Sequence, residues 1–147
     1  MTKTDYYLDI ARAVSKKSTC LKKKYGAIIV NNDEVISTGY NDTCRKEAHC
    51  TVCTKPSGNG DMEEYVVCPA VHAEMNCIIS ASRKEMLGAD IYLTGFNVAY
   101  EEEIDAYPCE ICLRLIKNAG IDRVINRTGI IYHRADDGIL YKGSWFK

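Results

Sequence analysis

The residues best suited to chemistry in this chain are His72, Glu74, Cys109 and Cys112, which lie in two short motifs. The first motif is His-Ala-Glu and the second is Pro-Cys-Glu-Ile-Cys. One histidine and two cysteines supply three zinc ligands and leave a fourth tetrahedral position for water. Zinc lowers the pKa of bound water from about 16 to about 7, and a nearby carboxylate can then move protons. The motifs therefore predict a hydrolytic zinc site.

Each motif is expected at the beginning of a helix. Apolar residues recur with helical spacing from His72 as far as Gly88, a glycine suited to a C-terminal cap. Pro108 suits the first position of a second helix, which should end at Gly120. Two such helix N-termini, facing each other, would converge on one metal. The expected inward faces are Met75, Ile78, Ile79, Ser82 and Met86 in the first helix, and Cys112, Leu115, Ile116 and Ala119 in the second.

The spacing within each motif assigns different roles to its residues. Cys109 and Cys112 are three residues apart, so both sulfurs should lie on one helix face, about one turn apart. Glu74 is only two residues from His72 and cannot share its helical face. We therefore expect Glu74 to point past the metal as a proton carrier and not to bind it.

The other elements predict an α/β protein with a layered sheet. A first helix should begin at a cap formed by Thr4 or Asp5, and residues 25–39 should form an antiparallel hairpin. Strands are expected at 90–94 and 124–125, with 129–133 continuing or pairing beside the last of these. A hairpin followed by alternating helices and strands favours a single α/β domain over residues 1–147. Residues 139–146 could add an edge strand or dock across the fold.

Composition restricts the class of protein. The net charge of −1 and pI near 6.3 do not favour binding to a nucleic acid polymer or to a membrane surface. Neither a secretory leader nor an apolar run of membrane-spanning length is expected. Eight cysteines in such a cytoplasmic chain are better explained as metal ligands or catalytic groups than as disulfides.

Two segments have no clear period. The first, at about 42–70, is an insert with four cysteines, and a metal ion that holds it together would explain their density. The second, at 95–107, is acidic and leads into the zinc motif. It could be a flap over the substrate, with Phe96 or Tyr107 as an aromatic face, or a surface hairpin without a substrate role.

At these residues the chain resembles the cytidine and deoxycytidylate deaminase superfamily, and within it the dCMP deaminase branch. His-x-Glu followed by Pro-Cys-x-x-Cys is the signature of zinc deaminases, whose glutamate is not a ligand. The resemblance implies a three-layer α/β/α fold with a five-stranded mixed sheet, and a homo-oligomer, commonly a hexamer in this branch. It also implies that His72, Cys109 and Cys112 bind the catalytic zinc and that Glu74 is the proton shuttle. The resemblance rests on residues 26–30, 37–41, 72–76, 91–94, 108–112 and 119–124.

The implied reaction is hydrolytic deamination of a cytosine nucleotide, dCMP to dUMP plus ammonia. Alternative substrates are free cytidine, a cytosine nucleoside triphosphate or another amino-heterocycle. A different alternative is a binding module that zinc stabilises and that catalyses no reaction. Phosphate contacts are expected from Lys22 to Lys24 or from Arg83, although a solvated lysine loop and a surface salt bridge are the simpler explanations. The expected substrate-binding residues are Asn41, for the sugar hydroxyl, with Lys24, Ala73 and Tyr107.

A second, structural zinc is expected in the cysteine-rich part, as in some dCMP deaminases. Its predicted ligands are Cys20, Cys50, Cys53 and Cys68, with His49 as a substitute for one thiolate. The alternative is a set of free thiols, and Cys44 and Cys77 are expected to be unliganded. Asp42 stands where the branch usually has glycine, which weakens any transfer of allosteric nucleotide regulation to this chain.

Overall fold

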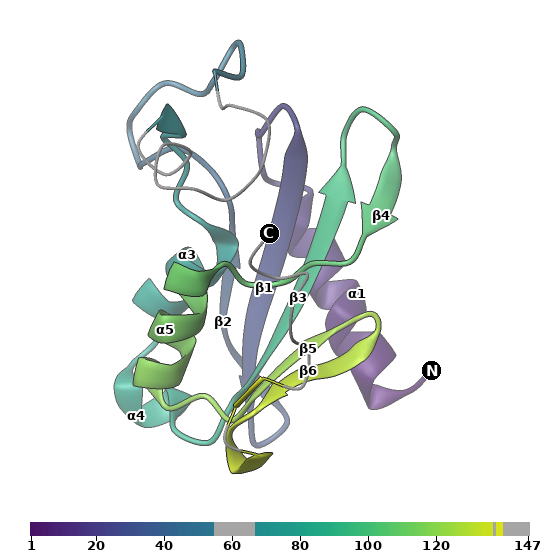
Figure 1. Ribbon diagram of the computed structural model, residues 1–147, viewed down its shortest axis with the longest axis vertical. Helices are drawn as coiled ribbons and strands as arrows, with labels where there is room; N and C mark the ends of the chain where they lie inside the picture. The colour runs from purple at the N-terminus through teal and green to yellow at the C-terminus, as the bar shows by residue number, and fades with distance from the viewer. Residues whose placement is uncertain (55–66, 137, 140–147) are drawn as a thin grey trace.

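The computed structural model describes residues 1–54, 67–136 and 138–139. These residues form one mixed sheet with helices on both faces (Figure 1). The strand order is β2-β1-β3-β5-β6-β7, and β4 pairs with β3 beside that path. β3 and β5 are parallel, while the other neighbours are antiparallel. The strands are β1 (Lys23–Asn31), β2 (Glu34–Tyr40), β3 (Asp90–Asn97), β4 (Glu102–Ile104), β5 (Arg123–Asn126), β6 (Gly129–His133) and β7 (Gly138–Ile139). The helices are α1 (Lys3–Ser15), α3 (Ala73–Ile79), α4 (Arg83–Met86), α5 (Glu110–Ala119) and a 3-10 turn (Arg134–Asp136).

Two hydrophobic clusters show that the fold has three layers. On one face of the sheet, α1 packs against the strands through Tyr7, Leu8, Ala11, Ile28, Val30, Tyr92 and Ile125. On the other face, α3 and α5 pack through a cluster that includes Ala27, Ile29, Ala73, Cys77, Leu93, Leu113 and Ile116. The expected α/β/α fold is therefore confirmed. The five longer strands form the expected mixed sheet, and the short strands β4 and β7 extend it.

The expected hairpin at 25–39 is confirmed and is longer than predicted. β1 and β2 pair from Gly26 opposite Tyr40 to Asn31 opposite Glu34. Asn32 and Asp33 form the turn with φ angles of 50° and 62°, the positive values that a type I′ turn requires. β1 begins at Lys23, so two of the three lysines that were expected in a loop belong to a strand.

The first helix begins earlier than predicted. Thr2 is its N-cap, because the Thr2 side chain accepts a hydrogen bond from the backbone of Asp5 and the Asp5 carboxylate accepts one from the backbone of Thr2. This reciprocal capping box supersedes the cap expected at Thr4 or Asp5.

The segment after His72 forms two helices and not the single helix that was expected to reach Gly88. A second capping box, between Ser82 and Glu85, begins the four-residue α4. The buried side of α3 also differs from the prediction. Ala73, Glu74 and Cys77 are buried, whereas Ile79 is 76% exposed.

The helix that carries the cysteine motif has Cys109 as its N-cap and Glu110 as its first residue, two residues after the predicted first position at Pro108. Gly120 ends it with a φ of 88°, as predicted. Leu113 replaces Leu115 on the buried face, since Leu115 is 37% exposed.

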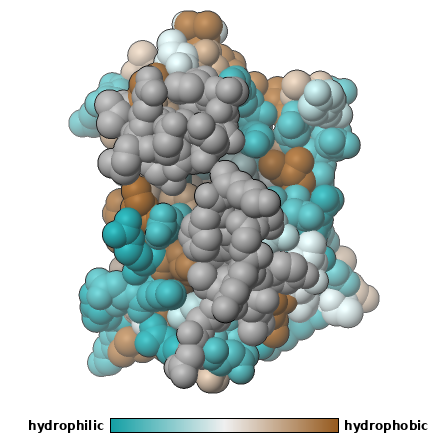
Figure 2. All heavy atoms as spheres, viewed as in Figure 1, coloured by the Kyte–Doolittle hydropathy of each residue, from teal (hydrophilic) through white to brown (hydrophobic). Residues whose placement is uncertain are grey.

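The cysteine-rich insert has little regular structure where it is described. Residues 43–54 form turns and bends, and Asp42 makes an isolated bridge to Val71. Residues 55–66 lie outside the described residues, as do 140–147, so the predictions for the rest of the insert and for most of the tail stay predictions. The same holds for the single domain over residues 1–147. Among the described residues, no helix is long and apolar enough to cross a membrane. Figure 2 shows hydrophilic and hydrophobic residues interspersed on one face of the molecule.

Candidate metal centre

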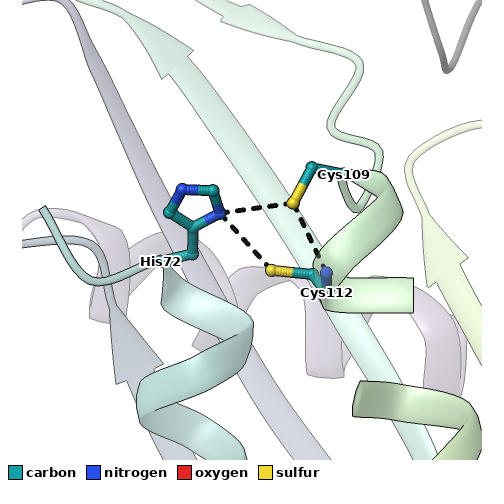
Figure 3. Close-up of side chains that lie close together, drawn as sticks. All are labelled: His72, Cys109 and Cys112. Atoms are coloured by element: carbon teal, nitrogen blue, oxygen red, sulfur yellow. Dashed lines mark hydrogen bonds between the residues drawn. The ribbon is translucent and has the colours of Figure 1, made fainter. Parts of the chain in front are cut away.

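His72, Cys109 and Cys112 meet between the beginnings of α3 and α5 (Figure 3). The Nδ1 atom of His72 lies 3.6 Å from the sulfur of Cys109 and 3.4 Å from that of Cys112. In the described part of the chain, no other group of three or more His, Cys, Asp or Glu residues places its ligand atoms within 4.8 Å of one another. The structure thus brings together the three ligands that the two motifs predict.

These separations fit a tetrahedral zinc ion. Zinc binds nitrogen at about 2.0–2.1 Å and sulfur at about 2.3 Å, so two ligands in a tetrahedron lie about 3.5 Å apart. The two distances from His72 Nδ1 agree with that spacing. One imidazole and two thiols also suit zinc better than magnesium or calcium, which prefer oxygen ligands.

The beginning of α3 is held against β2 by close backbone packing. A Cβ added at Gly39 would lie 2.4 Å from both the carbonyl oxygen of Ala73 and the amide nitrogen of Cys77. Only glycine allows the helix to approach the strand this closely. The side chain of Asn76 donates to the carbonyl of Tyr40 at 2.8 Å, and the Asp42–Val71 bridge lies next to His72.

The beginning of α5 is held by the strand behind it. The buried Asn126 of β5 donates its side-chain N–H to the carbonyl of Ala106 at 2.9 Å. Within the helix, the amide of Cys112 donates to the sulfur of Cys109 at 3.4 Å. An N–H group at a helix N-terminus that points at a sulfur favours its thiolate form.

Glu74 is buried beside the cluster without belonging to it. The residue is 5% exposed, and burial is the main reason that its pKa is raised above the usual value. Its carboxyl interacts with His72 and with both thiols. A raised pKa suits a carboxyl that must both accept and release a proton near neutral pH.

The thiol of Cys112 is crowded in the metal-free site. A hydrogen bond with Cys109, burial and the neighbouring Glu74 all raise its pKa. A divalent cation reverses this balance, because a coordinating thiol loses its proton. A bound cation would therefore favour the thiolate form of Cys112, which burial alone disfavours.

Asn41 is buried at the end of β2, where its amide already binds the backbone. Its Oδ1 accepts from the amide of Tyr25 at 2.7 Å, and its Nδ2 donates to the carbonyl of Lys23 at 2.9 Å. A primary amide has a second N–H and further acceptor capacity. The predicted contact with a sugar hydroxyl stays a prediction.

The other predicted substrate contacts differ in their positions. Ala73 is fully buried in the first turn of α3, and Tyr107 packs against the cluster on the side of α3 and α5. Lys24 lies in β1 opposite Phe96. By strand alternation both face α1, together with Ile28 and Tyr92, and away from the metal ligands. Arg83, a predicted phosphate contact, donates to the carbonyl of Asn118 at 2.6 Å.

The acidic segment at 95–107 forms a hairpin in which two carboxylates are paired with arginines. Glu103 accepts from Arg12 at 2.7 Å, and Asp105 accepts from Arg127 at 2.6 Å. Ile104, between them, points the other way and lies against Gly95. These contacts hold β4 on the sheet, so they favour the surface hairpin over the flap.

The four cysteines predicted for a structural zinc line one small cavity of about 40 Å³. The pKa of Cys50 is raised by burial and then by the thiols of Cys68, Cys20 and Cys53, so these sulfurs are near neighbours. They are not gathered as closely as the ligands at His72. His49 binds Asp42 and Thr19 on the outside of this cavity.

Two residues at the site have no recognised sequence signal. The sequence places Tyr25 in a strand without a role and gives no sign of Asn126, whereas Lys23 is one of the three lysines expected to contact a phosphate. The alternation of β1 could have paired Lys23 with Tyr25, but only once the first residue of the strand was known. The contact of Asn126 spans 20 residues and has no local pattern.

A His-Cys-Cys cluster with a buried glutamate, carried by helices on an α/β sheet, is the arrangement of zinc-dependent deaminases. The chain belongs to the cytidine and deoxycytidylate deaminase family, whose zinc-binding region matches residues 1–128.

Individual relatives agree with this assignment. The deoxycytidylate deaminase of Mycobacterium phage D29 is 32% identical over 127 residues, which cover 82% of this chain and 91% of that protein. The one from Schizosaccharomyces pombe is 32% identical over 128 residues, which cover 84% of this chain and 36% of that protein. The apo structure of dCMP deaminase from cyanophage S-TIM5 is similar with a TM-score of 0.63 and 26% identity, over 84% of this chain and 81% of that one. The chain thus spans most of each phage protein but only about a third of the yeast protein.

Proposed function

We propose that this protein is a zinc-dependent hydrolase that deaminates dCMP to dUMP and ammonia. The observation that carries the proposal is the buried carboxyl of Glu74 beside three zinc ligands spaced for a tetrahedral ion. A purely structural zinc site would leave this buried carboxyl without a role, although its burial has a cost in stability. Catalysis explains why it is there.

Zinc held by His72, Cys109 and Cys112 supplies a Lewis acid that makes water acidic enough to attack near neutral pH. The remaining steps belong to Glu74. Its carboxylate takes a proton from the attacking water and delivers it to the ring nitrogen next to C4 of the cytosine. As the water oxygen bonds to C4, a second transfer moves the proton of the new C4 hydroxyl to the exocyclic amine, the C4–N bond breaks, and ammonia leaves. The buried position of Glu74 keeps bulk water away from these transfers.

Support for a nucleotide substrate comes from the relatives that are named deoxycytidylate deaminase. The ion pairs of the acidic hairpin also reduce repulsion of a phosphate, since Arg12 and Arg127 offset the charges of Glu103 and Asp105. Cytidine, dCTP and other amino-heterocycles are the alternatives within the same chemistry. The alternative outside deaminase chemistry is a zinc-binding module that catalyses no reaction.

A panel of cytosine compounds tests the substrate. We expect the loss of cytosine absorbance to be fastest with dCMP and slower with deoxycytidine, cytidine, CMP, dCTP and cytosine. The panel should be run with and without dCTP and dTTP, which reveals any nucleotide effector. A preference for an unphosphorylated nucleoside would reject dCMP as substrate and keep the deaminase. No turnover of any compound would reject the enzyme.

A second zinc, bound by Cys20, Cys50, Cys53 and Cys68, is part of the same proposal. Its support is the shared cavity, which exceeds the volume that one water needs. Thr43 also lines this cavity, and its buried hydroxyl has no hydrogen-bond partner among the described residues. A closed four-thiolate site would hold an insert that otherwise has little regular structure.

Metal analysis tests the second zinc. We expect about two zinc ions per chain in the purified protein and about one in Cys53→Ser, whose remaining thiols cannot close the site. Cys44→Ser is the matched control, because Cys44 is an exposed cysteine of the same insert and should leave the zinc content unchanged. One zinc in the unaltered protein, with four titratable thiols, would disprove the second site.

A cytoplasmic location and a homo-oligomer complete the proposal. None of the eight cysteines forms a disulfide in the structure, which agrees with a reducing compartment. Ile79 and Leu87 are 76% and 56% exposed on the side of α3 and α4, which suits contact with another subunit. A hexamer is the expected size, which light scattering or sedimentation can measure.

A further inference from the structure

His72 stands where an extended segment enters α3. It is the N-cap of that helix, with a φ of −71° and a ψ of 155°, and its side chain makes no capping hydrogen bond. Its carbonyl accepts the first hydrogen bond of the helix, from the amide of Asn76 at 3.0 Å. The position of the His72 ring therefore depends both on the helix after it and on the segment before it.

The residue before His72 is fixed by Asp42. The amide of Val71 donates to the carbonyl of Asp42 at 2.7 Å, and the amide of Asp42 donates to the carbonyl of Val71 at 3.2 Å. The pair forms an isolated antiparallel bridge outside the strands of the sheet. Both backbone groups of Val71 are thus tied to one residue, so a shift of Asp42 moves the segment that carries His72.

The carboxylate of Asp42 is itself held by three groups. Its Oδ1 accepts from the hydroxyl of Thr19 at 2.7 Å and from the amide of Thr43 at 2.9 Å. Nδ1 of His49 lies 3.2 Å from the same oxygen and 3.0 Å from the Thr19 hydroxyl. The Asp42 side chain is only 13% exposed. Burial alone would raise the pKa of this carboxyl, but the hydrogen bonds from Thr19 and Thr43 outweigh burial and lower it. Hydrogen bonds to an ionised carboxylate are stronger than neutral ones, so they fix Asp42 firmly.

The residues beside Thr19 and Asp42 are joined in a similar way. The hydroxyl of Ser18, a buried residue, donates to the carbonyl of Asn41 at 2.6 Å. The side chain of Asn41 is bound to the backbone of β1 as well. Loss of the Asp42 carboxylate would therefore loosen Val71 and leave Asn41 in place. The role of Asp42 can thus be separated from that of Asn41.

We propose that Asp42 is a positioning residue for His72: its carboxylate, held by Thr19 and His49, fixes Val71 and thereby places the histidine ligand opposite the two cysteines. This inference rests on the proposed zinc-dependent function and not on the choice of substrate. Residues that orient a metal ligand without touching the metal change metal affinity by about 10- to 100-fold when they are replaced. Because Asp42 acts through Val71, we expect an effect at the lower end of that range.

Zinc affinity tests Asp42 independently of turnover. Competition with a chromophoric chelator gives the Kd of zinc, measured in Cys53→Ser protein so that the His-Cys-Cys cluster alone determines the result. Asp42→Ala is expected to raise this Kd by about 10-fold. Asp42→Asn keeps an oxygen that can accept from Thr19 and Thr43, so it should recover most of the affinity.

Asp90→Ala is the matched control. The Asp90 side chain is similarly buried, at 17% exposed, and accepts two hydrogen bonds from Arg123. It begins β3 opposite Val30, at the end of β1 away from Asn41. Asp90→Ala should lower the Tm as Asp42→Ala does, but it should leave the Kd of zinc unchanged.

Thr19→Val is a second variant that is safe for folding, because Thr19 is exposed. It removes only the hydroxyl that donates to Asp42 at 2.7 Å. The Kd of zinc should rise in the same direction as in Asp42→Ala but by a smaller factor, since one hydrogen bond of the network is lost and the carboxylate remains.

Three results would overturn the inference. An unchanged Kd of zinc in Asp42→Ala would show that α3 alone positions His72. An equal rise in Asp90→Ala would assign the effect to overall stability. A Kd in Asp42→Asn as high as in Asp42→Ala would show that the charge, and not the hydrogen bonds, acts on the metal. These results concern zinc binding alone, so they are independent of whether the substrate panel supports the deamination of dCMP.

Discussion

Replacing Glu74 by Gln is expected to lower kcat for dCMP by about 10²- to 10⁴-fold, the range for losing a general acid–base group. The variant should keep its zinc, because Glu74 lies outside the cluster of ligand atoms formed by the described residues. Gln has nearly the same shape but cannot carry a proton between water, ring and leaving amine. The loss should therefore appear in kcat much more than in the affinity for dUMP.

The stability of this variant gives a second readout. Burial disfavours the ionised form of Glu74, and a neutral amide avoids that cost, so the Tm should be unchanged or higher. Glu110→Gln is the matched control, since Glu110 lies between the two cysteine ligands in the first turn of α5 but is exposed. It should keep full activity. Full activity in Glu74→Gln would contradict the proposed mechanism, and loss of zinc would make Glu74 a structural residue.

The convergence of His72, Cys109 and Cys112 could be predicted because the information for it is local. Cys109 and Cys112 are one helical turn apart, and each motif stands at the beginning of a helix. These features depend on spacing and on helix signals within a few residues. The predicted positions of His72 and the two cysteines therefore do not depend on where the two helices end.

Some of the errors could have been avoided with the same kind of signal. The pair Thr2 and Asp5 and the pair Ser82 and Glu85 are both three residues apart and form capping boxes. Giving Ser82 its preferred place as an N-cap would have divided the helix after His72. Helical spacing of apolar residues alone could not have divided this helix, because the spacing continues across the break between α3 and α4.

The position of the substrate contacts could not be predicted from local patterns. Whether Lys23 or Lys24 lies on the same face of the sheet as the metal centre depends on the register of β1 against β3 and on which face α1 covers. A shift of one residue exchanges the two faces. The direction of the acidic side chains likewise depends on Arg12, which lies 91 residues from Glu103 in the sequence.

Replacing Cys112 by Ser is expected to remove the catalytic zinc and, with it, all detectable deamination. The change leaves two ligands of the three, and a neutral hydroxyl replaces a sulfur that would bind zinc as a thiolate. Cys112 is fully buried, so no neighbouring side chain can take its place without moving the beginning of α5. The zinc content should fall by about one ion per chain.

The loss should also be visible in stability. A ligand that binds only the folded protein stabilises it by about 4 kcal/mol when its free concentration is 1,000 times Kd. For a domain of this size, that corresponds to a rise in Tm of roughly 10 °C. Zinc added to the chelated protein should produce such a rise, and Cys112→Ser should lack the part that the catalytic site contributes.

Cys77→Ser separates metal binding from the burial of a thiol. Cys77 is also fully buried, but its sulfur donates to backbone carbonyls of β1 and β2, which a serine hydroxyl can replace. This variant should keep its zinc and its activity, even where its Tm is somewhat lower. If Cys112→Ser binds zinc as the unaltered protein does, the His-Cys-Cys cluster is not the metal centre. If Cys112→Ser and Cys77→Ser lose zinc to the same extent, the loss is caused by disturbed core packing and not by removal of a zinc ligand, because Cys77 is not a ligand.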